Sequence, residues 1–210
     1  RAKAIATWWW ILSSANGLRE RRFDAVLNRL GLHRRELRAW AMYDWANSAF
    51  AVTIVTAIFP VYFTSVAAAG ISPAEATRRL AMATTIALAI SAVLAPVLGA
   101  VADYAPVKKR LLGLFMAIGA LASGALFFIQ RGDWQMAALL FGIGNIGFAA
   151  SLAFYDSLLP HVASEDEIDR VSTAGYAIGY LGGGLLLALN VAWIISPSTF
   201  GLPDAALASR

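Results

Sequence analysis

The chain of 210 residues is 59% hydrophobic and 14% charged, with a formal net charge of +4, whereas soluble domains carry about 25% charged residues. A soluble fold cannot bury so large an apolar fraction, so the composition indicates an integral membrane protein without a water-soluble catalytic domain. The chain has no cysteine, which excludes disulfides, thiolate metal sites and cysteine nucleophiles, and its basic residues flank apolar stretches, which favours a membrane surface over nucleic acid.

Residues 1–39 form a basic leader. The apolar run Trp8–Leu12 is too short to span a bilayer, so it is either an interfacial anchor or an upstream extension without consequence. Phe23, Leu27 and Leu30 recur at helical spacing among arginines. This spacing predicts a basic amphipathic helix on the cytoplasmic leaflet, and a solvated helix before the first span is the alternative.

Five windows with few or no charges are each long enough to cross the hydrocarbon core as a helix, which takes about 20 apolar residues. They predict an all-α polytopic membrane protein, because a membrane barrel would show short segments of alternating polarity. The predicted bundle covers residues 40–196, and residues 197–210 form a loop after span five. The predicted spans are residues 41–67, 80–102, 111–130, 134–158 and 171–195.

The positive residues set the predicted orientation. Of the 17 Lys and Arg residues, 13 lie in segments 1–39, 103–110 and 159–170, all on one side of the predicted bundle. Because cytoplasmic loops hold the excess of positive charge, we expect a cytoplasmic amino terminus, with the loops at 68–79 and 131–133 outside.

Glycines are grouped in the fourth and fifth windows. The segment Gly142–Gly147 matches a dinucleotide-binding fingerprint, but it lies inside an apolar span rather than between a strand and a helix, so we expect helix contacts there. Gly175, Gly179 and Gly183 are four residues apart. This spacing predicts a helix-packing face.

Ser157 and His161, with Asp156 beside them, superficially resemble a hydrolase group. We expect Pro160 to interrupt the helix between them, and no second constellation faces them. The sequence therefore predicts no enzyme, no catalytic residue, no metal site and no cofactor.

Asp and Asn side chains within the predicted spans favour transport, because polar groups at membrane depth are usually functional. They are Asp44, Asn47, Asn145, Asp156 and Asn190, and the first four are the candidates for a solute or ion path. We expect Asp44 in the first turn of span one, where the helix dipole favours a carboxylate, and Asp156 in the last turn of span four, where the dipole disfavours one. Asp156 is then the stronger candidate for binding a substrate amine, a cation or a proton. The alternative function is a membrane scaffold, in which such groups only join helices.

The loop between spans two and three has a recognisable pattern. Gly99 precedes Asp103 by four residues, and Lys108, Lys109 and Arg110 follow. This pattern resembles the signature loop of the major facilitator superfamily. The resemblance implies that the glycine permits a tight turn and that Asp103 and the cations latch the two halves of a transporter.

Four segments resemble, in matching order, the vacuolar amino-acid effluxer branch of that superfamily and its bacterial permease relatives: Trp40–Phe50, Ala102–Pro106, Phe154–Pro160 and Asp169–Gly184. The resemblance implies a secondary transporter with twelve spans in two six-helix halves and a central path bordered by spans one and four. Five spans then correspond to an amino-terminal half, with the carboxy-terminal half missing. The implied partners are the lipid bilayer and a small solute such as an amino acid, with a coupled proton or ion, and the implied location is a bacterial cytoplasmic membrane.

Overall fold

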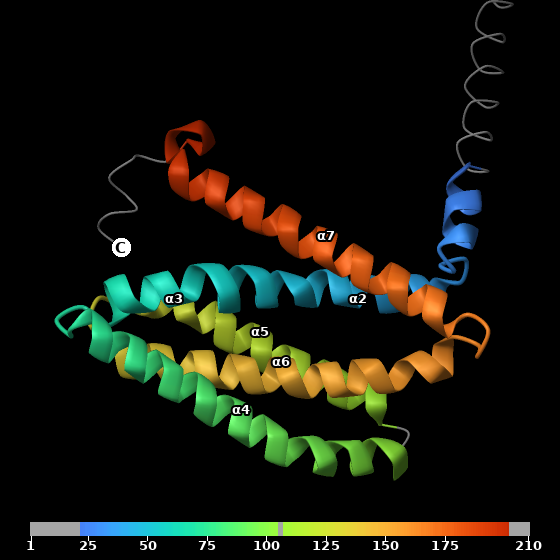
Figure 1. Ribbon diagram of the computed structural model, residues 1–210, viewed down its shortest axis with the longest axis horizontal. Helices are drawn as coiled ribbons and strands as arrows, with labels where there is room; N and C mark the ends of the chain where they lie inside the picture. Colours follow the sequence, from blue (N-terminus) through green and yellow to red (C-terminus); the bar gives the residue numbers. More distant parts are fainter. Residues whose placement is uncertain (1–21, 105–106, 202–210) are drawn as a thin grey trace, which may run out of the picture.

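The long apolar windows fold into long helices. The computed structural model describes residues 22–104 and 107–201, and Figure 1 shows them as a bundle of roughly aligned helices. Within this part of the chain, five helices are long and apolar enough to cross a membrane. The prediction of an all-α polytopic membrane protein is confirmed.

Span one is a helical rod from Arg35 to Ala67 that changes its winding along its length. It consists of α2 (Arg35–Ala49), the π-helix η1 (Phe50–Ile58), α3 (Phe59–Tyr62) and the π-helix η2 (Phe63–Ala67). Pro60 has no backbone N–H, so one carbonyl in the preceding turn lacks its helical donor. The wide π turns lie on both sides of this proline. Such turns are rare in proteins and are frequently found at functional sites.

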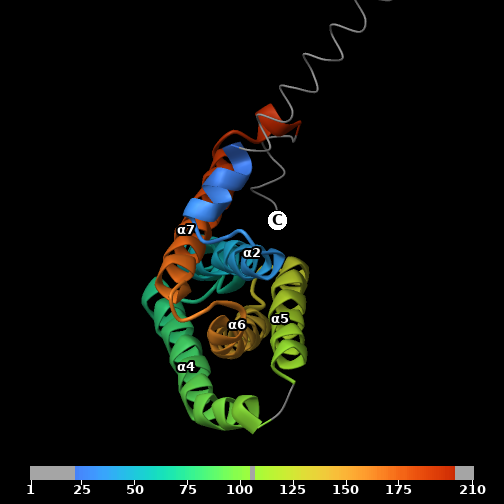
Figure 2. The same ribbon diagram turned by 90° about the vertical axis from the view of Figure 1, so that its right-hand side faces the viewer.

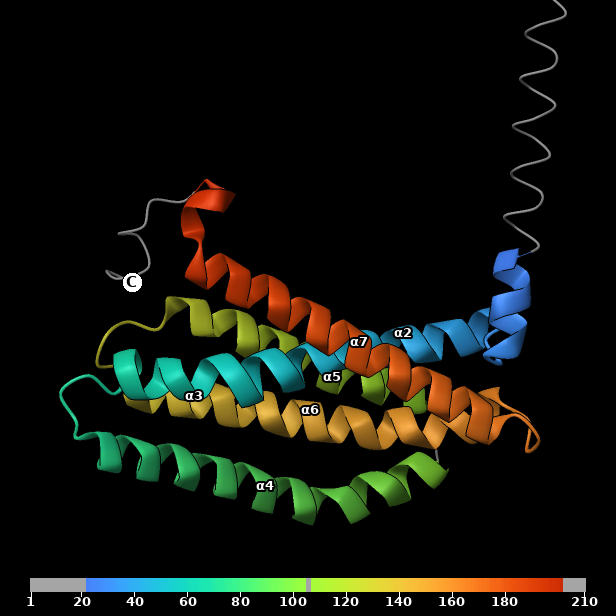
Figure 3. The same ribbon diagram turned by 45° about the horizontal axis from the view of Figure 1, so that its top comes forward.

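The remaining spans follow with short connections. They are α4 (Pro73–Tyr104), α5 (Lys108–Ala125) with the 3-10 turn η3 (Leu126–Phe128), α6 (Trp134–Val162) and α7 (Ile168–Ile195), after which comes η4 (Pro197–Phe200). Residues 22–29 form a further helix before α2. Pro96 lies inside α4, and the carboxyl-terminal part of this helix bends away from its first part (Figure 3).

Viewed along the bundle, α2 and α6 occupy the centre, α5 lies on one side, and α4 and α7 lie on the other (Figure 2). The closest pairs are α5 with α6, α2 with α7, and α4 with α6. Two clusters of buried hydrophobic residues lie toward opposite ends of the bundle. The Trp40 cluster comprises Leu32, Leu37, Trp40, Ala41, Tyr155, Ala163, Val171 and Ala174. The Phe59 cluster comprises Phe59, Phe63, Ala67, Ala68, Ala76, Ile129, Ala137 and Phe141.

The helices differ from the predicted spans at their ends. Span one begins at Arg35 rather than residue 41, and α4 begins at Pro73 rather than residue 80. Hydropathy marks the part of a helix that suits hydrocarbon, whereas the helix itself continues into polar residues. The expected interruption at Pro160 is wrong, because α6 continues through it to Val162. The Trp8–Leu12 run and most of the segment 197–210 lie outside the described residues.

Candidate functional site

A cavity of about 600 Å³ lies between the two buried clusters. Its walls come from α2, η1, α5, α6 and α7, and they include residues Tyr43 to Ile54 of span one and Gly144 to Ser151 of α6. These segments lie between Trp40 and Phe59 on span one and between Phe141 and Tyr155 on α6. The cavity is therefore near the middle of the spans, the depth at which transporters bind solutes.

Two hydroxyl groups at this cavity are buried and have no hydrogen-bond partner among the described residues, namely Tyr43 Oη and Thr53 Oγ1. An unsatisfied buried polar group costs about 1–3 kcal/mol. Asn47, one of the predicted path residues, also lines the cavity. The cavity lining is mainly apolar, with Asn47, Ser123 and Asn190 among its polar residues.

Asn145 does not join Asn47 at this site. Its Nδ2 donates to the carbonyl of Phe141 in the same helix at 2.8 Å, and it is not among the residues that line the cavity. Its observed contact is therefore within α6.

Asp156 lies on α6 with its side chain exposed beside α7. Tyr176 of α7 donates a hydrogen bond from its hydroxyl to Asp156 Oδ1 at 3.5 Å. Pro160, four residues later in α6, has no N–H to donate to the backbone carbonyl of Asp156. Asp156 therefore presents both a carboxylate and a carbonyl that lacks its usual helical donor.

Asp44 is buried, with 6% of its surface exposed. It lies nine residues after Arg35, the first residue of α2, so the expectation of a first-turn carboxylate stabilised by the helix dipole is wrong, since that effect fades beyond the first turn. Gly179 of α7 lies against its carboxylate, because a Cβ at this glycine would contact Asp44 Oδ2. Asp44 and Asp156 therefore both contact α7.

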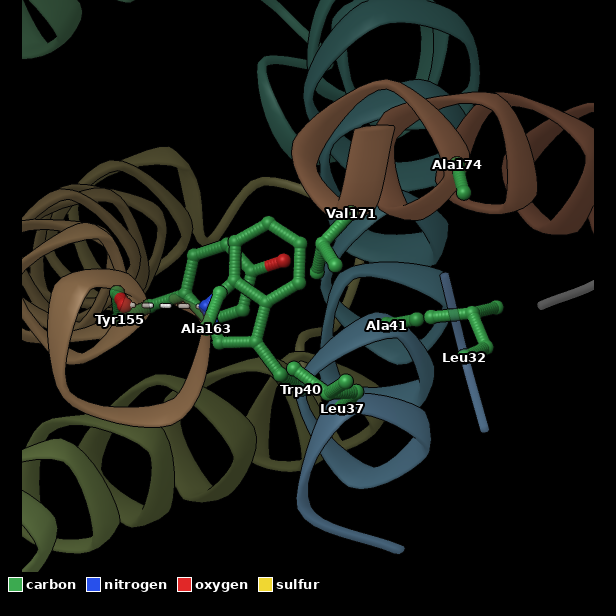
Figure 4. Close-up of a cluster of buried hydrophobic side chains, with 8 residues drawn as sticks. All are labelled: Leu32, Leu37, Trp40, Ala41, Tyr155, Ala163, Val171 and Ala174. Carbon is green, nitrogen blue, oxygen red and sulfur yellow. Dashed lines mark hydrogen bonds between the residues drawn. The ribbon is translucent and has the colours of Figure 1, made fainter. Parts of the chain in front are cut away.

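Aromatic side chains bring the two carboxylate segments together. Tyr155 stacks on Trp40 with ring centroids 4.4 Å apart and on Tyr43 at 4.9 Å. Trp40 Nε1 donates to the carbonyl of Tyr155 at 3.3 Å, as Figure 4 shows. Tyr176 meets the edge of Trp40 at 6.3 Å. These aromatic residues are not among the predicted site residues, although a Tyr-Asp dipeptide occurs in both α2 and α6 and is visible in the sequence.

The three spaced glycines of α7 lie on the face that packs against α2. A Cβ at Gly175 would meet the Trp40 ring, and one at Gly183 would approach Val52 Cγ2 to 2.8 Å. Together with Gly179, these glycines let α7 approach the side chains of span one closely.

The signature-loop residues lie mainly in helices. Gly99 and Asp103 belong to α4, and Lys108, Lys109 and Arg110 form the first turn of α5. The expectation of a tight turn at Gly99 is wrong, because this glycine continues the helix. Lys108 Nζ donates to the carbonyl of Ser157 at 3.4 Å, which ties the start of α5 to α6. Ala105 and Pro106 lie outside the described residues.

A polar network ties the leader to the connection between α6 and α7. Arg34 Nη2 donates to Glu167 Oε2 at 2.7 Å and to the carbonyl of Val162 at 2.9 Å. His33 Nε2 lies 3.5 Å from Glu167 Oε1. The backbone and side chain of Ser164 also donate to Glu167. The two hydrogen bonds from Ser164, with smaller electrostatic contributions from Arg34 and His33, hold the pKa of Glu167 below its usual range.

We expect Glu167→Gln to lower the melting temperature of the purified chain at neutral pH, because the amide loses the charge that Arg34 and Ser164 bind. A lowered folded-state pKa means that the stabilisation is complete above the ordinary pKa of Glu and is lost as pH falls through the folded-state value. The difference from wild type should therefore shrink in acid. Glu165→Gln, an exposed neighbour in the same loop, serves as the control, and equal melting temperatures for Glu167→Gln and wild type at pH 7 would contradict the prediction.

The described residues contain no group of three His, Asp or Glu side chains arranged to hold a metal ion. The site is instead built from carboxylates, hydroxyls and aromatic rings on α2, α6 and α7.

The similarity of the chain to known proteins identifies its family. The chain is 34% identical over 170 residues to the uncharacterized MFS-type transporter YxiO of Bacillus subtilis. The matched segment covers 80% of this chain and 40% of that protein. The chain is also 30% identical over 97 residues to autophagy-related protein 22 of Neurospora crassa. This second match covers 44% of this chain and 13% of that protein. The matched segment therefore covers less than half the length of each of these two relatives. No solved structure matches it. Residues 75–203 match the family described as vacuole effluxer Atg22 like, and the chain belongs to this family.

Proposed function

We propose that this chain forms part of a secondary transporter that moves a small solute carrying a protonated amine, of the amino-acid class, by alternating access. The observation that carries the proposal is the pair of acceptors that Asp156 offers on α6, a carboxylate that accepts from the Tyr176 hydroxyl of α7 and a backbone carbonyl without a donor at Pro160. Family membership supports transport as the general activity.

The chemistry of this group suits an ammonium ion. A primary ammonium has three donors and no acceptor, and Asp156 supplies acceptors of both kinds. The Tyr176 hydroxyl contacts the Asp156 carboxylate, and the Trp40 ring meets the edge of the Tyr176 ring. The proposal assigns no catalytic residue.

The proposed coupling runs through α7. An ammonium bound at Asp156 competes with Tyr176 for the same carboxylate oxygen, so binding changes a contact between α6 and α7. The same helix packs its glycine face over Asp44. Because these contacts use small residues, α7 can shift relative to α2 with little steric obstruction, and the occupancy of Asp156 would then bias its position.

A membrane scaffold is the alternative function. A bundle whose helices only pack would be expected to satisfy its buried polar groups, whereas Tyr43 Oη, Thr53 Oγ1 and Tyr155 Oη are buried without partners in the described part of the chain. These unsatisfied hydroxyls favour transport.

We expect Asp156→Asn to reduce solute flux about tenfold or more, because a charge-assisted hydrogen bond contributes about 1.5–3 kcal/mol. The measurement is counterflow of radiolabelled amino acids in vesicles that contain the intact protein to which this chain belongs. Asp166→Asn, which removes an exposed carboxylate from the loop between α6 and α7, is the matched control. Unchanged flux and unchanged pH dependence in Asp156→Asn would overturn the proposal.

We further infer that the protein lies in a bacterial cytoplasmic membrane with its amino terminus in the cytoplasm, which the distribution of positive residues supports. The chain has no cysteine, so single cysteines report accessibility directly. Ala74→Cys and Glu165→Cys are both at exposed positions. On intact cells, an impermeant maleimide should label position 74 but not position 165, and the reverse pattern would invert the topology.

The latch role of Asp103 also stays a proposal, supported by its exposed position at the end of α4, close in sequence to the cations of α5. In the same flux assay, Asp103→Asn is expected to slow transport with normal insertion. Wild-type rates would leave Asp103 as an interfacial residue without this role.

A further inference from the structure

The helix at residues 22–29 runs across the bundle rather than along it. Figures 1 and 3 show it lying across the end of the bundle where α2 and α7 begin, rather than alongside these helices. Because the spans follow the membrane normal, a helix across their ends runs parallel to the membrane surface. This orientation is typical of interfacial helices.

The crossing angle is set by a defined turn. Leu32 N donates to the carbonyl of Leu27 at 2.7 Å, and Gly31 N donates to the carbonyl of Asn28 at 3.2 Å. Gly31 has a φ of +73°. This pattern of bonds around a left-handed glycine is a Schellman motif, which ends a helix and redirects the chain.

The turn is also anchored to the bundle. Leu32 is buried in the Trp40 cluster, and Leu27 packs against that cluster. Arg38 Nη1 donates to the carbonyl of His33 at 3.0 Å, which ties the linker to α2. The helix therefore has a fixed position relative to the spans.

One face of this helix carries exposed apolar side chains. Phe23, Val26 and Leu30 are 61%, 51% and 39% exposed, and their spacing of three and four residues places them on one face. Arg22 and Arg29 are also exposed. On a helical projection both arginines fall beside Val26, at one edge of the apolar face.

We propose that residues 22–30 form an interfacial anchor, in which Phe23, Val26 and Leu30 insert below the headgroups of an anionic leaflet and Arg22 and Arg29 bind lipid phosphates. Two observations favour lipid as the occupant. The apolar face lies at the end of a bundle that itself exposes apolar side chains along α4 and α7, so one bilayer can cover both. The flanking arginines match the negative charge of phospholipid headgroups.

The test uses single cysteines labelled with an environment-sensitive fluorophore, in the purified chain reconstituted into lipid nanodiscs of phosphatidylcholine with or without phosphatidylglycerol. Val26→Cys probes the apolar face, and Asn28→Cys is the control, because it is exposed on the same helix but away from that face. A nitroxide attached to the lipid headgroup should quench the label at position 26 at least about twofold more strongly than the label at position 28.

The charge component has its own test. Phosphatidylglycerol should strengthen the quenching at position 26, and the double variant Arg22→Gln/Arg29→Gln should remove that dependence on lipid charge. Equal quenching at positions 26 and 28 would overturn the anchor. A label at position 26 that is blue-shifted but unaffected by nitroxide lipid would also overturn it, since protein rather than lipid would then cover the face.

Discussion

Gly147→Ala in α6 is expected to destabilise the bundle by about 1–3 kcal/mol, the usual cost of forcing an extra carbon into a packed contact. A Cβ at this position would lie 2.7 Å from Gly119 N and 2.9 Å from the carbonyl oxygen of Phe115. Both atoms belong to the backbone of α5, so no side-chain rotation can make room. The methyl group can be accommodated only if α5 and α6, one of the closest helix pairs in the bundle, move apart.

The measurement is the melting temperature of the purified protein in detergent, followed by circular dichroism. Gly142→Ala is the matched control, because it lies in the same helix and the nearest atom to its added Cβ is Ala87 Cβ at 4.0 Å. The control should match wild type or exceed it, since alanine favours a helix over glycine by about 1 kcal/mol. If both variants melt together, the backbone contact at Gly147 is not essential to the fold.

The fold class followed directly from hydropathy, but the helix ends did not. Apolar windows predict spans because each must cover the hydrocarbon thickness. Arg35 to Ala39 are mainly polar or charged, so they carry no hydropathy signal, although they are helical. The dipole interpretation of Asp44 depended on a helix start near Trp40, and it was wrong because α2 begins five residues earlier, at Arg35.

The site could be predicted only one helix at a time. The spacing of Gly175, Gly179 and Gly183 predicted one packing face from α7 alone, but the residues opposite them depend on which helix packs there. The stacked pair of Tyr43 and Tyr155 is 112 residues apart in the chain and 4.9 Å apart in space, and periodicity within a helix contains no information on such pairs. For the same reason, the sequence could not predict that Asn47 lines the cavity and that Asn145 does not.

The contacts of α7 give the proposed transport mechanism its physical basis. This helix packs mainly against α2 and contacts α6 through the hydrogen bond from Tyr176 to Asp156. A change at either carboxylate therefore acts on one rigid element. The Trp40–Tyr155 stack joins α2 to α6. Trp40 also contacts Gly175 and Tyr176 of α7, so a movement of α7 changes the surroundings of this stack.

Gly179→Ala is expected to reduce solute flux about tenfold, equivalent to about 1.4 kcal/mol, while the melting temperature changes little. The added methyl would contact Asp44 Oδ2 and lie 2.9 Å from Ser48 Oγ. Both are ends of side chains, so they can rotate away, but the Asp44 carboxylate must then leave its position against α7. Flux is measured in vesicles containing the intact protein.

Gly184→Ala is the matched control for this change, because it lies on the same helix with nothing within 4 Å of its added Cβ. A double-mutant cycle identifies the cause: if the methyl acts by displacing Asp44, Gly179→Ala should have no further effect on flux in an Asp44→Ala background. Additive losses in the cycle would show that Gly179 acts on transport by another route, since a group that has already been removed cannot be displaced. Wild-type flux in the single variant would show that the position of Asp44 against α7 does not matter for transport.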